Sequence, residues 1–331
     1  MTDVTRPDRP VGSTPPVRVA VLGASGFIGQ AVVNELRGAG HDVVELPRVR
    51  VDGPGWPDVV SAVPRWIEHN QAAYELLVRQ MEGARVVVNA AGMAVPESRD
   101  VARLTAANAV LPGVLAHAAS EAGVPRLVHV SSAAAQGTRD PLDESPTTAP
   151  ITPYGESKAQ GEHVLLDGAF KTPPEVVVYR PTSVQGAGRR MTRQLTRLAR
   201  MPLVPLFAGG DCHVPVALSQ NVAAAIRFLC TAPSPPGICL HPWEGMTARG
   251  LLEALGATRF VPVPAWCSRA ALSTLYLTGR GWPGAAAVAR RLDVLARGQG
   301  QDARHLDSLG FRLPVGVEGY QALGGLPRSG Q

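Results

Sequence analysis

A tyrosine and a lysine stand four residues apart, as Tyr154 and Lys158 in the stretch Tyr-Gly-Glu-Ser-Lys. Within a helix this spacing places both side chains on one face. A phenol, with a pKa of about 10, is a poor proton donor and acceptor at neutral pH, and a neighbouring ammonium group lowers that pKa by favouring the phenolate. We therefore expect Tyr154 to act as a general acid and base that Lys158 activates. The alternative is a structural contact on a helix surface.

A glycine-rich turn, Gly-Ala-Ser-Gly-Phe-Ile-Gly, occupies residues 23–29. It follows an apolar run that predicts a strand and precedes a helical pattern. In this context the three glycines permit a tight turn, close approach of the backbone to a diphosphate, and close packing of helix on strand. The helix N-terminus adds N–H donors and a partial positive charge. The alternative is an ordinary glycine-rich loop. We expect a dinucleotide to bind at Gly23, Ser25, Gly26, Phe27, Ile28 and Gly29.

The end of the second expected strand bears on the choice of dinucleotide. An acidic residue there binds the free ribose of NAD, whereas an arginine pairs with the 2′-phosphate of NADP. The sequence has Pro47 followed by Arg48, and a guanidinium suits a phosphate. This favours NADP(H), with NAD possible. In the alternative, Arg48 is an ordinary loop residue and Glu45 or Asp52 binds the ribose.

Two hydroxyl groups, Ser131 and Ser132, follow the apolar run Val128-His129-Val130. In a parallel sheet the carboxyl ends of the strands are where ligands bind. A hydroxyl at Ser132 could donate a hydrogen bond to a substrate oxygen while Tyr154 transfers the proton. The alternative is an ordinary turn residue, a common role for serine after a strand.

The elements that must position these residues alternate between strand and helix through the first 180 residues. Such alternation predicts an α/β fold with a parallel sheet and helices on both faces. Residues 53–70, rich in Gly and Pro, are expected to be irregular and to hold an inserted loop. The expected strands are 17–22, 43–46, 85–89, 127–130 and 176–179, and the expected helices are 30–38, 72–81, 101–122, 154–166, 192–200 and 222–229.

Composition excludes several classes of partner. The net charge is +5, but the basic residues are dispersed without interleaved aromatics, so no nucleic-acid partner is expected. The four cysteines (residues 212, 230, 239 and 267) form no C-x-x-C pair and have no histidine cluster, so we expect reduced thiols, no metal and a cytoplasmic location. No apolar stretch approaches 18 residues, so no membrane span is expected. Residues 1–16 are expected to be a disordered tail.

Taken together and in order, these motifs resemble the extended short-chain dehydrogenase/reductase family, which includes NAD-dependent epimerases and dehydratases. The resemblance covers residues 17–325. The matching segments are 23–29, Asn89-Ala90-Ala91-Gly92, Asn108, 131–137, 154–158, 179–186, 215–226 and 310–314.

The resemblance implies a Rossmann-type domain over residues 17–186. Residues 187–331 would form mostly a substrate-binding lobe, with some segments returning to the sheet. It also implies four catalytic roles: Ser132 would polarise a carbonyl, Tyr154 would be the general acid, Lys158 would also bind the nicotinamide ribose, and Asn108 would support the geometry. Further cofactor contacts would come from Asn89, Ala90, Ala91, Gly92, Pro181 and Val184.

The substrate is less constrained. Relatives that remove water carry an acidic pair after the active-site hydroxyl; here Ala133 and Ala134 follow Ser132, so a 4,6-dehydratase is not expected. Arg189 and Arg193 are expected to bind a sugar diphosphate, although a solvated arginine face is an alternative. The sequence is similar to nucleotide-sugar 4-ketoreductases, and many relatives are homodimers.

We therefore expect NADP(H)-dependent reduction of a 4-keto-6-deoxy nucleotide sugar. The alternatives are an epimerase with retained NAD, a reductase of a non-sugar ketone, and a non-catalytic NADP-sensing or scaffold protein.

Overall fold

The computed structural model describes residues 15–51, 58–95, 98, 100–168, 174–264, 290 and 292–325. Most of the expected N-terminal tail, Asp52 and Cys267 lie outside these residues. The main sheet contains, within the described residues, six strands in the order β2-β1-β3-β4-β5-β9, and every neighbouring pair is parallel. The strands are β1 (Arg18–Leu22), β2 (Asp42–Glu45), β3 (Val86–Asn89), β4 (Arg126–Val130), β5 (Glu175–Arg180) and β9 (Ile238–Leu240).

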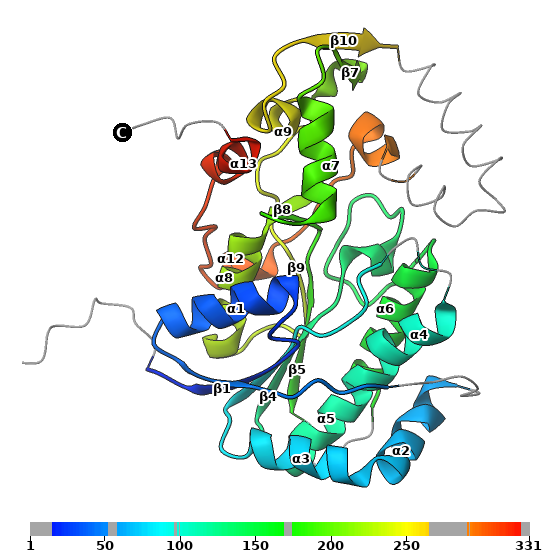
Figure 1. The fold of residues 1–331 in the computed structure, drawn as a ribbon, viewed down its shortest axis with the longest axis vertical. Helices are drawn as coiled ribbons and strands as arrows, with labels where there is room; N and C mark the ends of the chain where they lie inside the picture. Colours follow the sequence, from blue (N-terminus) through cyan, green and yellow to red (C-terminus); the bar gives the residue numbers. More distant parts are fainter. Residues whose placement is uncertain are drawn as a thin grey trace, which may run out of the picture.

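Helices cover both faces of this sheet, as expected for a Rossmann-like fold (Figure 1). On one face α1 (Phe27–Gly38) packs against α8 (Ser219–Thr231), and a cluster of buried residues that includes Val19, Val33 and Ile226 fills the space. On the other face α2 (Val59–His69), α3 (Gln71–Met81), α5 (Leu111–Glu121) and α6 (Pro153–Leu166) bury a second cluster around Val87 and Leu115. The alternation of elements in the sequence therefore predicts the layers correctly.

The prediction of an irregular segment over residues 53–70 is wrong for its second part. Residues Val59–His69 form α2, although Pro64 lies inside the helix. The Asp58 side chain caps the helix by accepting a hydrogen bond of 2.8 Å from the Ser61 N–H. Ala62, Val63 and Trp66 are buried in the second cluster, so packing of the apolar face outweighs the helix-breaking effect of the proline.

The segment from Val101 to Glu121, after β3, is helical throughout, as predicted, but the type of helix changes along it. It runs through α4 (Val101–Thr105), the π-helical turn η1 (Ala106–Val110) and α5, with Pro112 in the first turn of α5. A π-helical turn is rare and occurs often at functional sites. Asn108, one of the expected catalytic residues, lies in the middle of this turn.

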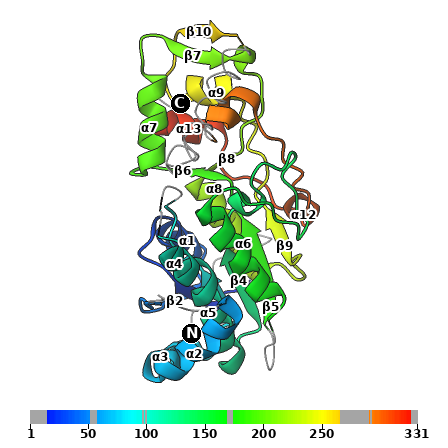
Figure 2. The ribbon, with the colours of Figure 1, turned by 90° about the vertical axis from the view of Figure 1, so that its right-hand side faces the viewer.

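The remaining elements gather at the carboxyl end of the main sheet (Figures 1 and 2). A third core cluster, around Leu206, Leu251 and Tyr320, holds them together. In the described residues no helix is long and apolar enough to cross a lipid bilayer. The elements are β6 (Ser183–Gln185) paired with β8 (Val216–Leu218), β7 (Val204–Phe207) paired with β10 (Phe260–Val263), α7 (Arg190–Ala199), α9 (Ala248–Ala254) and α13 (Val317–Gly324). The short helix α12 (His305–Ser308) lies instead beside β9, and its Leu306 belongs to the first cluster.

Candidate active site

The glycine-rich turn joins β1 to α1, as predicted. Gly23 adopts a φ of +84°, and a Cβ there would lie 2.6 Å from the Ala91 nitrogen. A Cβ at Gly29 would lie 2.0 Å from the Gly23 carbonyl oxygen, so both positions require glycine. Gly26 is the N-cap of α1, and no side chain caps the helix. The turn therefore presents backbone N–H groups at a helix N-terminus, an arrangement that fits a diphosphate.

Arg48 follows β2 and is exposed, at the same edge of the sheet as the glycine-rich turn. Glu45, an alternative ligand for the cofactor ribose, forms an ion pair of 2.9 Å with Arg37. Both side chains of this pair are exposed, so the structure places Glu45 and Arg48 at the same edge without choosing between them.

Tyr154 and Ser132 line one cavity of about 310 Å³ at the carboxyl end of the sheet. Ser132 lies just after β4 and is the N-cap of the short 3-10 helix Ala133–Gln136, where its Oγ accepts a hydrogen bond of 3.1 Å from the Ala134 N–H. Its hydroxyl also acts to lower the pKa of the Tyr154 phenol. The two side chains that were expected to contact a substrate oxygen thus line the same cavity.

Burial and two neighbours set the pKa of Tyr154 in the free protein. Burial raises the pKa of the phenol, while the Ser132 hydroxyl and the positive charge of Arg189 act against the rise. The phenol is therefore protonated at neutral pH and able to donate a proton. The expectation that Lys158, together with the charge of an oxidised nicotinamide, lowers this pKa applies to the protein with its cofactor bound and stays a prediction.

Lys158 lies one helical turn after Tyr154 on α6 and is buried. Its Nζ donates a hydrogen bond of 2.9 Å to the Val130 carbonyl oxygen at the end of β4. Burial lowers the pKa of this ammonium group to about 8, although the Glu162 charge acts in the opposite direction. A Cβ built on Gly92 would lie 3.3 Å from Nζ, so Lys158 also borders the segment after β3.

Asn108 links the segment after β3 to helix α6 by hydrogen bonds. Its side chain accepts a hydrogen bond of 2.8 Å from the Met93 N–H and donates to the Met93 carbonyl at 3.1 Å and to the Ser157 hydroxyl at 3.0 Å. α6 also approaches the π-helical turn closely, because a Cβ at Gly161 would lie 2.1 Å from the Asn108 carbonyl oxygen. Asn108 thus supports the helix that carries Tyr154 and Lys158.

The segment Asn89-Ala90-Ala91-Gly92 follows β3 beside the glycine-rich turn. Asn89 is fully buried; its side-chain oxygen accepts a hydrogen bond of 3.2 Å from the Ala91 N–H, and its amide contacts the His129 ring at 3.1 Å. Burial holds the pKa of His129 well below its ordinary value, so the ring is neutral. These contacts fix a backbone segment that forms one wall of the expected cofactor crevice.

The sequence analysis missed a buried ion pair beneath the site. Glu162 and Arg180 pair at 2.6 Å with almost no exposure of either side chain. Glu162 also accepts a hydrogen bond of 2.5 Å from Ser131, and Arg180 donates to the Ser145 carbonyl at 2.7 Å. One signal was available: Glu162 lies four residues after Lys158, on the same face of the helix. Ser131 thus anchors the loop, whereas Ser132 faces Tyr154.

The cavity around Tyr154 is mostly apolar. Pro181 and Val184, both expected cofactor contacts, are buried and line it together with Ile28. Ala133 and Ala134 line it too, and in the described residues no carboxylate does. From the C-terminal part, Leu195, Val214, Leu251, Val294 and Leu295 complete the wall.

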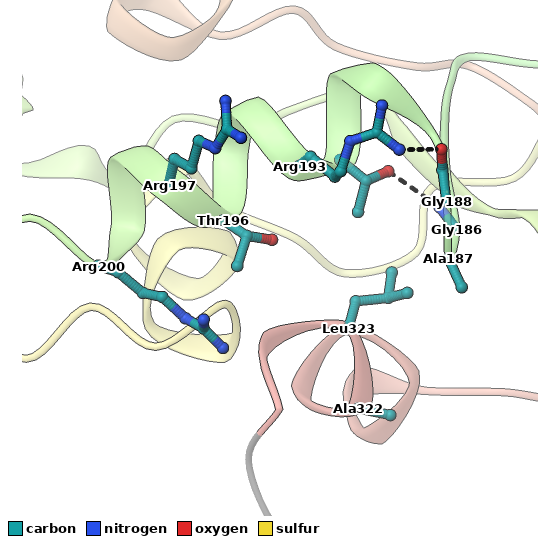
Figure 3. Close-up of a pocket in the computed structure, with 10 residues that line it drawn as sticks. Gly186, Ala187, Gly188, Arg193, Thr196, Arg197, Arg200, Ala322 and Leu323 are labelled. Atoms are coloured by element: carbon teal, nitrogen blue, oxygen red, sulfur yellow. Dashed lines mark hydrogen bonds between the residues drawn. The ribbon is translucent and has the colours of Figure 1, made fainter.

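The structure separates the two arginines that were expected to bind a substrate diphosphate. Arg189 lines the cavity of Tyr154, whereas Arg193 lines a second cavity of about 420 Å³ between α7 and α13. Figure 3 shows Arg193, Arg197 and Arg200 projecting from α7, with Ala322 and Leu323 across from them on α13. Arg193 donates a hydrogen bond to the Gly188 carbonyl. Of these two arginines, Arg189 is therefore the one placed to meet a ligand bound beside Tyr154.

Two further polar residues of the Tyr154 cavity lie far along the chain and carried no signal in the sequence. Arg290 pairs with Asp293 at 3.4 Å and donates to the Gly137 carbonyl at 3.2 Å. Gln299 donates to the same carbonyl at 3.1 Å. Both residues fix the C-terminal part of the chain against the loop that follows Ser132.

Comparison with known proteins is consistent with this geometry. The model of the NAD dependent epimerase/dehydratase family matches residues 19–236. A dTDP-6-deoxy-L-talose 4-dehydrogenase of Kitasatospora kifunensis is 28% identical over 267 residues, which are 75% of this chain and 81% of the relative. A UDP-glucose 4-epimerase of Azospirillum brasilense is 34% identical over 181 residues, 51% of this chain; the match spans only 50% of that enzyme.

Among solved structures, dTDP-4-dehydrorhamnose reductase of Bacillus anthracis in complex with NADP superposes with a TM-score of 0.62. The match covers 93% of this chain and 98% of that one at 17% identity, so it shows a shared fold.

Proposed function

This chain belongs to the NAD dependent epimerase/dehydratase family, whose members are enzymes of the extended short-chain dehydrogenase/reductase kind, and from that premise we propose that it is an NADP(H)-dependent reductase of a nucleotide-sugar ketone. The keto group would be that of a 4-keto-6-deoxy sugar. One observation carries the proposal: Tyr154 and Ser132 line the same cavity as Ile28, Pro181 and Val184, so the expected proton donor lies beside the expected cofactor contacts.

Reduction of a ketone requires a hydride at the carbonyl carbon and a proton at its oxygen. The nicotinamide, when bound, supplies the hydride. Ser132 would hold the carbonyl oxygen by a hydrogen bond, and Tyr154 would donate the proton to it. Because the walls of the cavity are mostly apolar, the charge that develops on the oxygen would be stabilised by these two hydroxyl groups rather than by water.

The residues present fit a dinucleotide. The diphosphate would bind at the first turn of α1, and Pro181 and Val184 would contact the nicotinamide. Lys158 would bind the nicotinamide ribose, and its positive charge would favour transfer of the Tyr154 proton. The exposed Arg48 would pair with the 2′-phosphate, which is the basis for proposing NADP(H).

The substrate class is supported by the relatives: the dehydrogenase from Kitasatospora kifunensis acts on a dTDP-6-deoxy sugar, and its match covers three quarters of this chain. The positions of Ala133 and Ala134 in the cavity wall argue against dehydration, which would need acidic groups at that place.

The test is a turnover assay with purified protein, in which NADPH absorbance is followed in the presence of dTDP-4-keto-6-deoxyglucose. We expect NADPH to be consumed and Tyr154→Phe to lower kcat by about 100-fold or more without weakening NADPH binding. Ser132→Ala should also lower kcat. NADPH consumption that is equal in the wild type and the Tyr154→Phe variant would contradict the proposal.

Two alternatives have their own support. The 34% identity to a UDP-glucose 4-epimerase favours an epimerase, which would retain NAD through purification and convert UDP-glucose without net cofactor consumption. The apolar cavity favours a non-sugar ketone, in which case NADPH would be oxidised with an apolar ketone and not with the nucleotide sugar.

A further inference from the structure

Arg189 lies over the start of α1, although it belongs to the loop between β6 and α7, far from α1 along the chain. It is the N-cap of α7, and its guanidinium carbon lies 5.1 Å from the centre of the Phe27 ring. Phe27 is the first residue of α1, the helix whose N-terminus is proposed to receive the cofactor diphosphate. A positive charge from the loop before α7 is therefore placed beside an expected anion site on a different part of the chain.

The same side chain reaches the reaction centre. Arg189 lines the cavity together with Ile28, Ser132 and Tyr154, and its Nη1 atom is buried. Its charge also acts on the phenol of Tyr154, opposing the rise of the pKa that burial causes. Arg189 therefore lies between the helix N-terminus and Tyr154, which are the two points that a bound dinucleotide has to connect.

The loop that carries Arg189 is fixed in this position. A Cβ at Gly186 would lie 2.7 Å from Phe27 Cζ and 2.7 Å from Ser219 Oγ, so the loop packs directly on the Phe27 ring. The Arg189 N–H donates to the Gly186 carbonyl at 3.3 Å, and Arg193 donates to the Gly188 carbonyl. Because the backbone is held from both sides, the guanidinium is positioned before any ligand binds, which lowers the entropic cost of binding.

An arginine at this place suits a diphosphate, because a guanidinium presents several N–H donors in one plane and binds phosphate oxygens in pairs. The guanidinium lies over the Phe27 ring, so a cation–π contact holds it near the start of α1. Arg193, Arg197 and Arg200 line the second cavity (Figure 3) and Arg190 is exposed, so Arg189 is the member of this arginine-rich segment that reaches the expected cofactor.

We propose that Arg189 binds the diphosphate of the dinucleotide, opposite the N-terminus of α1, and so closes the cofactor crevice from the side of α7. Arg189 is then a cofactor-binding residue contributed by the segment after β6. This inference rests on the proposed function, since it requires that a dinucleotide binds. In the rival assignment, Arg189 binds an anionic group of the substrate instead of the cofactor diphosphate.

The experiment measures dissociation constants by isothermal titration calorimetry for NADPH, ADP-ribose and AMP. ADP-ribose contains the diphosphate, whereas AMP has a single phosphate. We expect Arg189→Gln to raise the dissociation constants of NADPH and ADP-ribose by about tenfold or more, and that of AMP much less. Arg189→Lys should recover part of the loss, which shows that the variants fold. The loss of affinity caused by Arg189→Gln should be smaller at high salt, because salt screens the interaction between the guanidinium and the diphosphate.

The matched control is Arg190→Gln, which removes an equal charge from the exposed neighbouring residue and should leave all three constants unchanged. If Arg189→Gln binds NADPH and ADP-ribose as the wild type does while the KM for the ketone rises, the side chain serves the substrate and the inference is wrong. If the wild type itself binds neither NADPH nor NADH, the proposed function fails first, and this outcome is distinct from the other.

Discussion

At the scale of single residues, the proton on Tyr154 is the property on which the proposed reaction depends. Burial keeps the phenol protonated, and Ser132 and Arg189 moderate that effect. The types and spacing of Tyr154, Lys158 and Ser132 could be predicted because they lie within two short motifs. The contribution of Arg189 could not, since its distance from Tyr154 depends on how the segment after β6 packs on Phe27.

The pKa of Lys158 predicts a pH dependence of cofactor binding. The amine is charged below a pH of about 8 and neutral above it in the free protein. An anionic cofactor favours the charged form, so binding takes up a proton above that pH. We expect the dissociation constant of NADPH, measured by calorimetry, to change little close to pH 7 and to rise by up to about tenfold per pH unit above 8.

Two variants check the assignment to Lys158. Lys158→Met should weaken binding and remove the pH dependence, because no group remains to titrate. Lys158→Arg keeps the charge at all these pH values, so its binding curve should also be flat. A pH dependence that persists in Lys158→Met would assign the titration to a different group.

At the scale of elements, the site depends on how α6 meets its neighbours. Ser157 on α6 bonds to Asn108, and Gly161 touches the backbone of the π-helical turn. Strand and helix positions could be predicted from periodicity, whereas the π-helical turn and helix α2 could not. Both arise from tertiary contacts: Asn108 bonds to Met93 and Ser157, and Trp66 is buried in the second cluster despite Pro64, where α2 packs against α5.

The contact at Gly161 predicts that Gly161→Ala moves α6 away from the π-helical turn. The added methyl group would lie 2.1 Å from a backbone oxygen, so the free energy of unfolding should fall by about 1–3 kcal/mol and kcat should fall with it. The matched control is Gly38→Ala at the end of α1, where nothing lies within 4 Å of the new atom. Urea unfolding of both variants checks this, and equal stability would contradict it.

The pair of Glu162 and Arg180 predicts a loss of stability when one partner is removed. Glu162→Gln leaves Arg180 buried with an uncompensated charge, so we expect the free energy of unfolding to fall by about 3–5 kcal/mol. The control is Glu75→Gln, which breaks the exposed pair with Arg79 and should cost about 0.5 kcal/mol or less. The prediction is wrong if thermal melting shows the same loss for both variants.

At the scale of the whole molecule, the cavity is built from residues that are far apart in the chain, from Ile28 to Gln299. The sequence could predict the half of the site that belongs to the strand ends, because such ends meet at one edge of a parallel sheet. The other half, with Leu195, Leu251 and Val294, could not be predicted, since no local pattern records which segments pack against that edge.

Cofactor binding should stabilise the whole molecule, and the increase in stability with each dinucleotide shows which one is preferred. A ligand at 100 times its dissociation constant raises the free energy of unfolding by about 2.7 kcal/mol. We expect NADPH to raise the Tm more than NADH at equal concentration, and Arg48→Gln to remove that difference while leaving the NADH effect unchanged. Arg50→Gln is the control, since Arg50 is also exposed and lies two residues away. A preference that survives in Arg48→Gln would contradict the assignment.

The main sheet has its last strand, β9, supplied by residues 238–240, and the core beneath β1 includes Leu306 and Phe311. A ribosome has therefore released both proposed catalytic motifs long before the chain contains everything that this core needs. Until Leu306 and Phe311 emerge, α1 and α8 lack two of the side chains that cover them, and apolar surface stays open to solvent. Nascent chains of this protein should accordingly depend on chaperones until that segment is synthesised, and a message truncated after residue 300 should yield an insoluble product even though every proposed reacting group is present.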